Sequence, residues 1–374
     1  IRYFDVSEFI EAGKVITYSR DHHGLRGEYG GDPKNIDVLV IGGSTTNERF
    51  LDDQETWVAR LQELFQRAGK NLVITNASVD GQSTRGHIKA FDLWFPNVTG
   101  LRPRYVIGYV GINDLALGKD SEKFDDMQSP QISRRIRQYI LNHSVFYNQF
   151  RRIRGAFIAQ RTRHMHGANA VRTGKWVPVL NWTDRSQLKS VLDENLQSYR
   201  KRLRVLASRI IKFGAMPIYV TQRRGDYRFQ DGQLQKMIQI DSASDETETS
   251  DLGMLQMSKF NEVTLSVCQE LKITCIDVGA DIALEPADFY DGFHTMPSGS
   301  AKLAEFLFHE LKDVLKKDRG HNVIVFRHFG LNIFGETSTN LNGCSSHVAV
   351  CFRYDKRCGV TDFLWLCPAA QESL

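Results

Sequence analysis

Short apolar runs alternate along the chain with segments whose apolar residues recur at helical spacing. Five of these runs have the length and apolar character of strands that are buried on both faces, as in a parallel sheet. They are "IDVLVIG" (36–42), "NLVITNA" (71–77), "RYVIGYVG" (104–111), "MPIYVT" (216–221) and "ITCIDV" (273–278). The alternation predicts an α/β fold, a three-layer α/β/α sandwich around a central, mostly parallel five-stranded sheet.

Helical spacing marks the segments between these runs. Trp57, Leu61 and Leu64 fall on one face of a helix, and a final helix is expected after Ser298 and Gly299. A longer apolar stripe comprises Leu192, Leu196, Tyr199, Leu203, Leu206 and Ile210. The apolar face of the final helix comprises Leu303, Phe306, Leu307 and Leu311. In such sheets the functional site lies beyond the carboxyl ends of the strands.

The alternation stops between about residue 117 and residue 190, a stretch too long for a simple connection. We predict a basic, helical insertion here, with its helix through "SRRIRQYILNHSVFYNQFRRIRGAFIAQ". No acidic residue occurs from Met127 to Thr183. The arginines gathered there are Arg134, Arg135, Arg137, Arg151, Arg152, Arg154, Arg161 and Arg163. They form either a solvated face or a surface that contacts anionic molecules.

Three parts of the chain can be distinguished. Residues 1–35 form an N-terminal leader segment expected to pack on the domain, and residues 36–318 form the domain itself, insertion included. After Asp318 the helical pattern ends, so residues 319–374 are predicted to be an irregular, Cys-containing appendage with one short strand at most. Because the first residue is Ile1, we expect that the natural N-terminus, with a signal or anchor, is missing.

Composition narrows the choice of function. Of the 374 residues, 41% are hydrophobic and 25% are charged, which is typical of soluble globular proteins. The net charge of +4 is too small to indicate nucleic-acid binding, and no nucleic-acid-binding module is recognisable. The six cysteines have no metal-binding spacing. Cys268 and Cys275 are predicted to be buried small apolar residues, whereas the other four lie in the last stretch.

The first predicted strand ends in "VIGGSTTNERF" (40–50), with Ser44 at its tip. Three interpretations are open. Gly42 and Gly43 can serve a sharp turn, the loop can hold a phosphate, or Ser44 can be a nucleophile. Neither G-x-x-x-x-G-K-[ST] nor G-x-G-x-x-G follows the strand, which disfavours the phosphate loop.

Polar residues also follow the other strands. "NASVDGQST" carries Gly81, "GINDLAL" carries Asn113 and Asp114, and "YDGFHTMPSGS" places Asp291 three residues before His294. A serine nucleophile needs an imidazole base that a carboxylate orients. The oxyanion formed in acyl transfer needs N–H donors, which a backbone amide and an asparagine can supply.

The four blocks "GGSTT", "NASVDG", "GIND" and "DGFH" resemble, in order, those of the SGNH (GDSL-type) hydrolases. The resemblance covers roughly residues 36–316 without the insertion, and it implies the flavodoxin-like fold of that family. It implies that Ser44 is the nucleophile, His294 the base and Asp291 its carboxylate. Gly81 and Asn113 would join the Ser44 N–H in an oxyanion hole. The family requires no metal and no organic cofactor.

Two positions depart from the family pattern. Gly43 stands where the family's first block often has aspartate, and Ser78 stands where the second block often has glycine. We expect neither to change the chemistry. Thr46 excludes the G-x-S-x-G motif of α/β-hydrolases.

Structural explanations exist for the same residues. Asn113 can brace a loop, Asp291 can be a surface turn residue and His294 can start a helix. The histidine pairs suggest metal binding, but their sequence neighbours offer no ligand set, so solvated loop histidines are predicted. These pairs are His22 with His23 and His164 with His166.

The sequence thus predicts an ester hydrolase that removes O-acetyl or other short acyl groups from a carbohydrate, including an anionic one. The alternatives are a lipase or thioesterase of the same family, and a non-catalytic module that binds an anionic envelope polymer. The expected location is the bacterial cell envelope, periplasm or exterior, while the cytoplasm remains open. Membrane association would use the missing N-terminal segment.

Overall fold

The computed structural model of the chain describes residues 1–6, 10–117, 175–179, 189–230, 233–239, 247–248, 251–316, 351–354 and 361–364. The chain divides into two units, Ile1–Lys317 and Asp318–Leu374. Within the second unit, β12 (Cys351–Tyr354) and β13 (Thr361–Leu364) form an antiparallel pair, where the sequence predicts one short strand at most.

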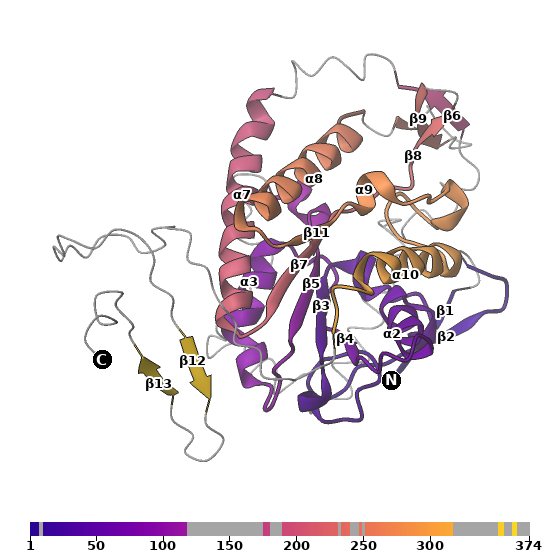
Figure 1. The fold of residues 1–374 in the computed structure, drawn as a ribbon. Coiled ribbons are helices and arrows are strands. Elements are labelled where there is room, and N and C mark those ends of the chain that lie inside the picture. The colour runs from indigo at the N-terminus through magenta and orange to yellow at the C-terminus, as the bar shows by residue number, and fades with distance from the viewer. Residues whose placement is uncertain are drawn as a thin grey trace, which may run out of the picture. The chain divides into compact units, whose positions relative to one another are not determined.

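A five-stranded parallel sheet is the centre of the first unit, and its strand order is β11-β7-β5-β3-β4 (Figure 1). All five predicted runs form its strands. Their bounds are β3 (Val38–Gly42), β4 (Ile74–Asn76), β5 (Tyr105–Tyr109), β7 (Met216–Val220) and β11 (Thr274–Ile276). The predicted α/β fold class is confirmed.

Helices cover both faces of this sheet, because successive side chains of each strand point to opposite sides. Leu39 and Ile41 of β3 belong to one apolar core, and Val38 and Val40 belong to another. The first core includes side chains of α3 (Thr84–Leu93), α7 (Lys189–Lys212) and α8 (Asp251–Leu271), and the second those of α2 (Trp57–Arg67) and α10 (Pro297–Leu311). Figure 1 shows these two helical layers on either side of the sheet.

Local capping fixes where several helices begin. The Thr56 side chain accepts a hydrogen bond from the Ala59 N–H at the start of α2, and Ser83 does the same for α3 through the Arg85 N–H. Helix α10 begins earlier than predicted, because Pro297 occupies its first position. Ser298 and Gly299 therefore lie in its first turn.

Shorter elements complete the described part of the first unit. The one-turn helices are α1 (Ser44–Asn47) and α9 (Val278–Asp281). The 3₁₀ turns are Pro33–Asn35, Asp53–Glu55, Phe95–Asn97, Ile112–Ala116 and Pro286–Asp288.

A second, antiparallel sheet was not expected from the sequence. It consists of β6 (Lys175–Pro178), β8 (Tyr227–Gln230), β9 (Gln233–Gln239) and β10 (Thr247–Glu248), with β9 paired to the other three. Strand β6 falls in the predicted helical insertion, so the helical prediction is wrong for residues 175–178. The arginine-rich segment 133–163 lies outside the described residues.

The N-terminal segment contributes a hairpin of β1 (Arg2–Asp5) and β2 (Val15–Tyr18). Further along, the backbones of Arg26 and Asn76 exchange hydrogen bonds of 2.9 Å, which adds an antiparallel bridge beside β4. Side chains of this segment form a third apolar core with Leu51, Tyr290 and Met296.

Cys268 in α8 and Cys275 in β11 are joined by a disulfide. The sequence interpretation of the two as separate small apolar residues is therefore wrong, although Cys268 is buried. The bond links the end of α8 to the strand that follows it.

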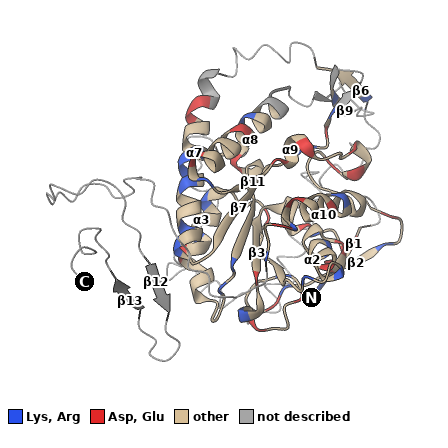
Figure 2. Ribbon diagram, viewed as in Figure 1, with Lys and Arg blue, Asp and Glu red and all other residues tan. Residues whose placement is uncertain are grey.

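Charged residues are absent from the strands of the central sheet. The five strands of the central sheet contain no Lys, Arg, Asp or Glu, whereas α7 carries acidic residues near its start and only basic ones from Arg200 onward (Figure 2). Among the described residues, no helix has the length and apolar character needed to span a membrane.

Candidate active site

Ser44 lies immediately beyond the carboxyl end of β3, as the first residue of α1. The two preceding glycines allow close approach of neighbouring groups. A Cβ atom on Gly42 would lie 2.2 Å from the Thr46 Oγ1, and one on Gly43 would lie 2.0 Å from the Asn113 Nδ2. Gly43 has a φ of −93°, so its role is to leave space and not to adopt a left-handed backbone.

His294 and Asp291 reach Ser44 from the loop before α10. The His294 Nε2 lies 2.8 Å from the Ser44 Oγ, and the His294 Nδ1 lies 2.7 Å from the Asp291 Oδ2. The other carboxylate oxygen, Oδ1, accepts the backbone N–H groups of Phe293 and His294, each at 2.8 Å. The three side chains form one continuous chain of hydrogen bonds.

The environment keeps the Asp291 carboxylate ionised. Burial alone would raise its pKa, but the hydrogen bond and charge of His294, together with the two backbone N–H donors, lower the pKa below its ordinary value. The Tyr290 ring stacks on the His294 ring at a centroid distance of 5.4 Å and an interplanar angle of 7°. The Asp291 hydrogen bond at the edge of the imidazole and the Tyr290 ring on its face therefore fix its orientation.

Two further loops contribute N–H donors. Gly81 has a φ of +74°, a left-handed conformation that favours glycine. The Asn113 Nδ2 donates to the Gln82 carbonyl at 3.0 Å, which leaves its second N–H for another acceptor. Within the described residues, the backbone N–H groups of Ser44 and Gly81 donate to no protein acceptor.

Ser44, Gly81, Asn113 and His294 line a single cavity of about 650 Å³. This volume is in the ordinary range for small-molecule sites. The structure thus brings four of the five predicted site residues to one cavity and places the fifth, Asp291, behind His294.

Sequence reasoning missed the buried Glu48, which follows α1. One of its oxygens accepts the Trp57 N–H at 2.7 Å, and the other accepts the hydroxyls of Thr295, at 2.7 Å, and of Ser300. Burial raises the Glu48 pKa to about 7, although these hydrogen bonds and the charge of Arg26 act in the opposite direction. Glu48 links the end of the Ser44 helix to the residue after His294.

Two cavity-lining arginines were also missed. Arg49 lies 3.2 Å from the Asp80 carboxylate, and its buried Nε has no partner among the described residues. Arg224 pairs with Asp226 at 2.9 Å between Nε and Oδ1 and lies over the Phe293 ring. No motif or periodicity in the sequence distinguishes either arginine from the others.

Asp114, next to Asn113, serves a different purpose. Its carboxylate is buried and accepts hydrogen bonds from the Thr84 hydroxyl, at 2.5 Å, and from the Arg202 guanidinium, at 2.9 Å. Nearby on α3, His87 contacts Gln82, and burial lowers its pKa to about 3. Both groups join α3 to neighbouring elements.

The histidine pair His22 and His23 has a carboxylate neighbour after all, because the ligand atoms of both rings and of Asp21 lie within 4.8 Å of one another. Both oxygens of Asp21 are engaged within its own loop. They accept the Leu25 N–H, at 2.7 Å, and the Tyr29 hydroxyl. The turn thus explains the cluster without a metal, and the pair His164 and His166 lies outside the described residues.

The model of the GDSL-like Lipase/Acylhydrolase family matches residues 40–302. A search of curated proteins finds no match.

Three solved structures illustrate the similarity to known folds. TesA is 15% identical, with 74% of this chain and 99% of that one covered and a TM-score of 0.39. The psychrotrophic esterase EstA from Pseudoalteromonas sp. is 11% identical, with 74% of this chain and 98% of that one covered and a TM-score of 0.38. A catalytic mutant of the acetylxylan esterase Axe2 from Geobacillus stearothermophilus is 16% identical, with 73% of this chain and 93% of that one covered and a TM-score of 0.40. Similarities of this size carry no weight for the activity of the chain.

Proposed function

The chain belongs to the GDSL-like lipase/acylhydrolase family, and on that basis we propose that it is a serine ester hydrolase in which Ser44, His294 and Asp291 form the catalytic triad. One observation carries the proposal: the three side chains form a continuous hydrogen-bonded chain that ends at a serine on the wall of a cavity. A serine hydroxyl becomes a competent nucleophile in this arrangement.

The proposed reaction has two steps. The Ser44 Oγ attacks the ester carbonyl carbon while the His294 Nε2 accepts its proton, and Asp291 stabilises the imidazolium through Nδ1–H. His294 then returns the proton to the departing alcohol, which leaves an acyl group on Ser44. A water molecule, deprotonated by His294, attacks this ester, and the carboxylic acid is released with Ser44 restored.

The negative charge on the carbonyl oxygen must be stabilised as the tetrahedral intermediate forms. We assign this role to the N–H groups of Ser44 and Gly81 and to the Asn113 amide, because these three residues line the same cavity. Donors already oriented in a low-dielectric site contribute far more than donors in water.

The proposed substrate is an O-acetyl or other short acyl ester of a carbohydrate. A cavity of about 650 Å³ is large enough for a short acyl group and part of a sugar. Its lining mixes polar side chains with Phe50, Ile112, Leu115 and Phe293. The alternatives are a lipase or thioesterase activity and a non-catalytic module. The test below separates the lipase and the non-catalytic module from the proposed activity.

Anionic carbohydrates fit the cationic groups near the site. Arg49 and Arg224 line the cavity, although each also has a carboxylate partner. The arginines of the insertion, Arg151, Arg152 and Arg154 among them, lie outside the described residues and stay part of the proposal. Electrostatic steering weakens with salt. For an acidic substrate kcat/KM should therefore fall with ionic strength, while for a neutral ester it should hardly change.

The test compares wild type with Ser44→Ala on p-nitrophenyl acetate, p-nitrophenyl palmitate and an acetylated oligosaccharide. We expect rapid acetyl release by wild type, little hydrolysis of palmitate, and a loss on the order of 10⁴-fold in the mutant at unchanged Tm. Turnover that persists in the mutant would contradict the role of Ser44. Preference for palmitate would favour a lipase, and a wild-type protein that binds acidic polymer without hydrolysing any ester would favour the non-catalytic module.

The location and the domain organisation are also proposals. A disulfide between Cys268 and Cys275 supports an oxidising compartment, such as the cell envelope, periplasm or exterior. Alkylation of the native protein before lysis would detect free thiols if the protein were cytoplasmic. We further propose that residues 319–374 are dispensable for catalysis, so a chain ending at Asp318 should fold and keep its kcat.

A further inference from the structure

The N-terminal segment lies outside the residues matched by the family model, yet it contacts both α1 and the Gly81 loop of the proposed active site. We propose that Arg20 is a positioning residue for the oxyanion hole, which holds the loop of Gly81 against the helix that begins with Ser44. The inference rests on the function proposed above and adds to it a residue that the family match does not contain.

The guanidinium of Arg20 directly bridges α1 and the loop that carries Gly81. Its Nη2 donates to the Asn47 Oδ1 at 2.7 Å and also to the Ser78 carbonyl. Asn47 is the last residue of α1, which starts at Ser44, and Ser78 precedes Gly81 on the loop after β4. One amino group therefore bonds both the nucleophile helix and the loop that supplies a predicted oxyanion donor.

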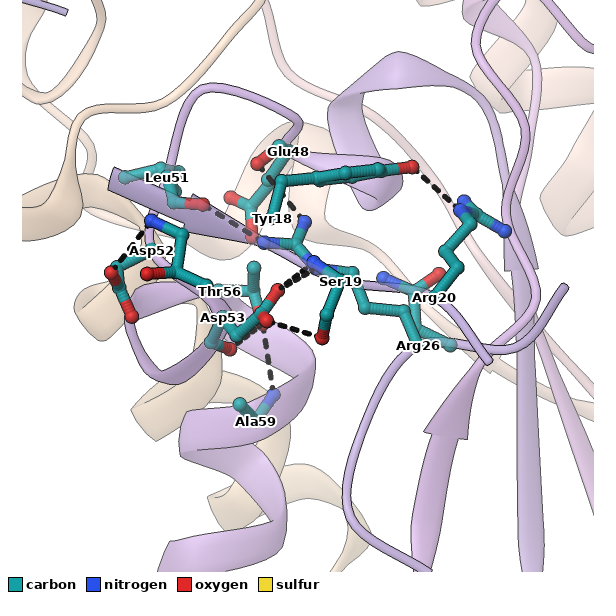
Figure 3. Close-up of polar contacts among 12 residues, drawn as sticks. Tyr18, Ser19, Arg20, Arg26, Glu48, Leu51, Asp52, Asp53, Thr56 and Ala59 are labelled. Atoms are coloured by element: carbon teal, nitrogen blue, oxygen red, sulfur yellow. Dashed lines mark hydrogen bonds and ion pairs between the residues drawn. The ribbon is translucent and has the colours of Figure 1, made fainter. Parts of the chain in front are cut away.

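Other contacts hold Arg20 in this orientation. Its Nε donates to the Tyr18 hydroxyl at 2.6 Å, and its Nη1 donates to the Gly24 carbonyl at 2.5 Å. The Tyr18 hydroxyl in turn donates to the Asn47 Oδ1 at 3.2 Å. Figure 3 shows Arg20 at the hydroxyl end of the Tyr18 ring.

Asn47 extends the bridge to the residue next to Gly81. Its Nδ2 donates to the Asp80 Oδ1 at 2.6 Å, and the other oxygen of Asp80 pairs with Arg49 at 3.2 Å. The Gly81 N–H belongs to the peptide between Asp80 and Gly81, so contacts that fix Asp80 also orient this donor. Arg20 and Asn47 thus hold the loop at two points, Ser78 and Asp80.

A second arginine of the segment fixes the far end of α1. The Arg26 guanidinium donates to the Glu48 carbonyl at 3.2 Å, the Leu51 carbonyl at 2.8 Å and the Asp53 carboxylate at 2.7 Å (Figure 3). Carbonyls at a helix end lack partners within the helix, and a cation is favourable there. Arg26 is only 2% exposed, so its removal should damage the whole fold. Arg20 is less buried and offers the cleaner test.

Without Arg20, the Ser78 carbonyl and the Asn47 amide lose a shared donor, and the Gly81 loop can shift relative to Ser44. A misplacement of about 1 Å can lower a catalytic rate about 100-fold. Arg20 does not itself line the cavity. We therefore expect Arg20→Ala to lower kcat about 10- to 100-fold while KM stays nearly unchanged.

The experiment measures kcat, KM and Tm on p-nitrophenyl acetate for wild type, Arg20→Ala, Arg20→Lys and Ser44→Ala. Arg60→Ala serves as the matched control, because the Arg60 Nε donates to the Glu55 carbonyl at 3.2 Å on another part of the surface. Inhibition by an alkyl boronic acid, which forms a tetrahedral adduct with serine, reports on the oxyanion donors. Guanidinium at non-denaturing concentration is added to Arg20→Ala as a rescue.

The proposal expects four results. Arg20→Ala loses kcat and boronate affinity by similar factors, guanidinium restores part of kcat, Arg20→Lys lies between wild type and Ala, and Arg60→Ala behaves like wild type. If Arg20→Ala keeps wild-type kcat and boronate affinity while Ser44→Ala is inactive, the proposal is overturned and the proposed function stands. An active Ser44→Ala would instead remove the proposed function, and this inference with it.

Discussion

Two clusters of this domain combine the same classes of side chain but face different surroundings. Each joins a hydroxyl, a carboxylate and a nitrogen-bearing group through hydrogen bonds. Their members are Ser44, Asp291 and His294 in the first, and Thr84, Asp114 and Arg202 in the second. Ser44 lines the cavity, whereas Thr84 is completely buried.

The pKa values of the two carboxyl groups are shifted in opposite directions. The pKa of Asp291 is lowered, because the contacts with His294 and two backbone N–H groups outweigh burial. The pKa of Asp114 is raised, because burial outweighs the opposing effects of Arg202 and Thr84. An imidazole can accept and return a proton near neutral pH, whereas a guanidinium stays protonated. Access to a cavity and a titratable partner, more than the presence of a carboxylate, distinguish the cluster that we propose to be catalytic.

The largest effect on activity is expected from Asp291→Asn. An amide at this position cannot stabilise the imidazolium, and it favours the wrong tautomer of His294, so kcat should fall on the order of 10⁴-fold. Stopped assays on p-nitrophenyl acetate, scaled to folded protein by circular dichroism, measure this loss. If kcat fell less than about tenfold, the two clusters would not differ as described.

Asn113→Ala should produce the next largest effect. Removing one oxyanion donor should lower kcat about 10²–10³-fold and leave KM almost unchanged. Tm and kcat are measured on the same preparation. A lower Tm with normal kcat per folded molecule would show that Asn113 only braces its loop, as Asp114 does.

A smaller loss is expected from Gly43→Ala. The new Cβ would lie 2.0 Å from the Asn113 Nδ2, so the amide must move away from the cavity. We expect kcat to fall about tenfold, with little additional loss when Asn113→Ala is already present, because both changes act on one donor. Losses that multiply in the double variant would mean that Gly43 acts elsewhere.

The smallest effect on activity is expected in the cluster of Thr84, Asp114 and Arg202. Arg202→Met leaves the Asp114 carboxylate buried without its cation, which should lower the free energy of unfolding by about 3–5 kcal/mol. At a temperature where the variant is still folded, kcat per folded molecule should match wild type. Denaturant unfolding and active-site titration separate the two quantities, and a kcat loss as large as that of Asn113→Ala would remove the distinction between the clusters.

The sequence predicted the parts of the molecule whose information is local. The sheet was predictable because each strand is a short apolar run, and the polar loops follow these runs directly. Helix α3 was missed because its apolar side is interrupted by Gly86 and His87. The Cys268–Cys275 bond was missed because a spacing of seven residues does not distinguish a bonded pair from two small apolar residues.

The contacts around Ser44 that were not predicted join residues far apart in the chain. Arg20 reaches Ser78 across 58 positions, and Glu48 reaches Thr295 across 247. Neither contact has a periodic or motif signature, because an arginine that binds carbonyls and a buried glutamate resemble any surface residue of their type. Only the folded arrangement identifies them.

The contacts between the N-terminal segment and α1 also affect the choice of fragment boundaries for expressing proteins of this kind. A fragment limited to residues 40–302 would lack Tyr18, Arg20 and Arg26, and it would end inside α10 before Leu303, Leu307 and Leu311, three side chains of the second apolar core. Such a fragment would expose core side chains to solvent, and exposed apolar patches promote aggregation. Expression of a fragment chosen by sequence similarity alone should yield insoluble protein. Its lack of activity would then reflect the chosen boundaries and not an inactive enzyme.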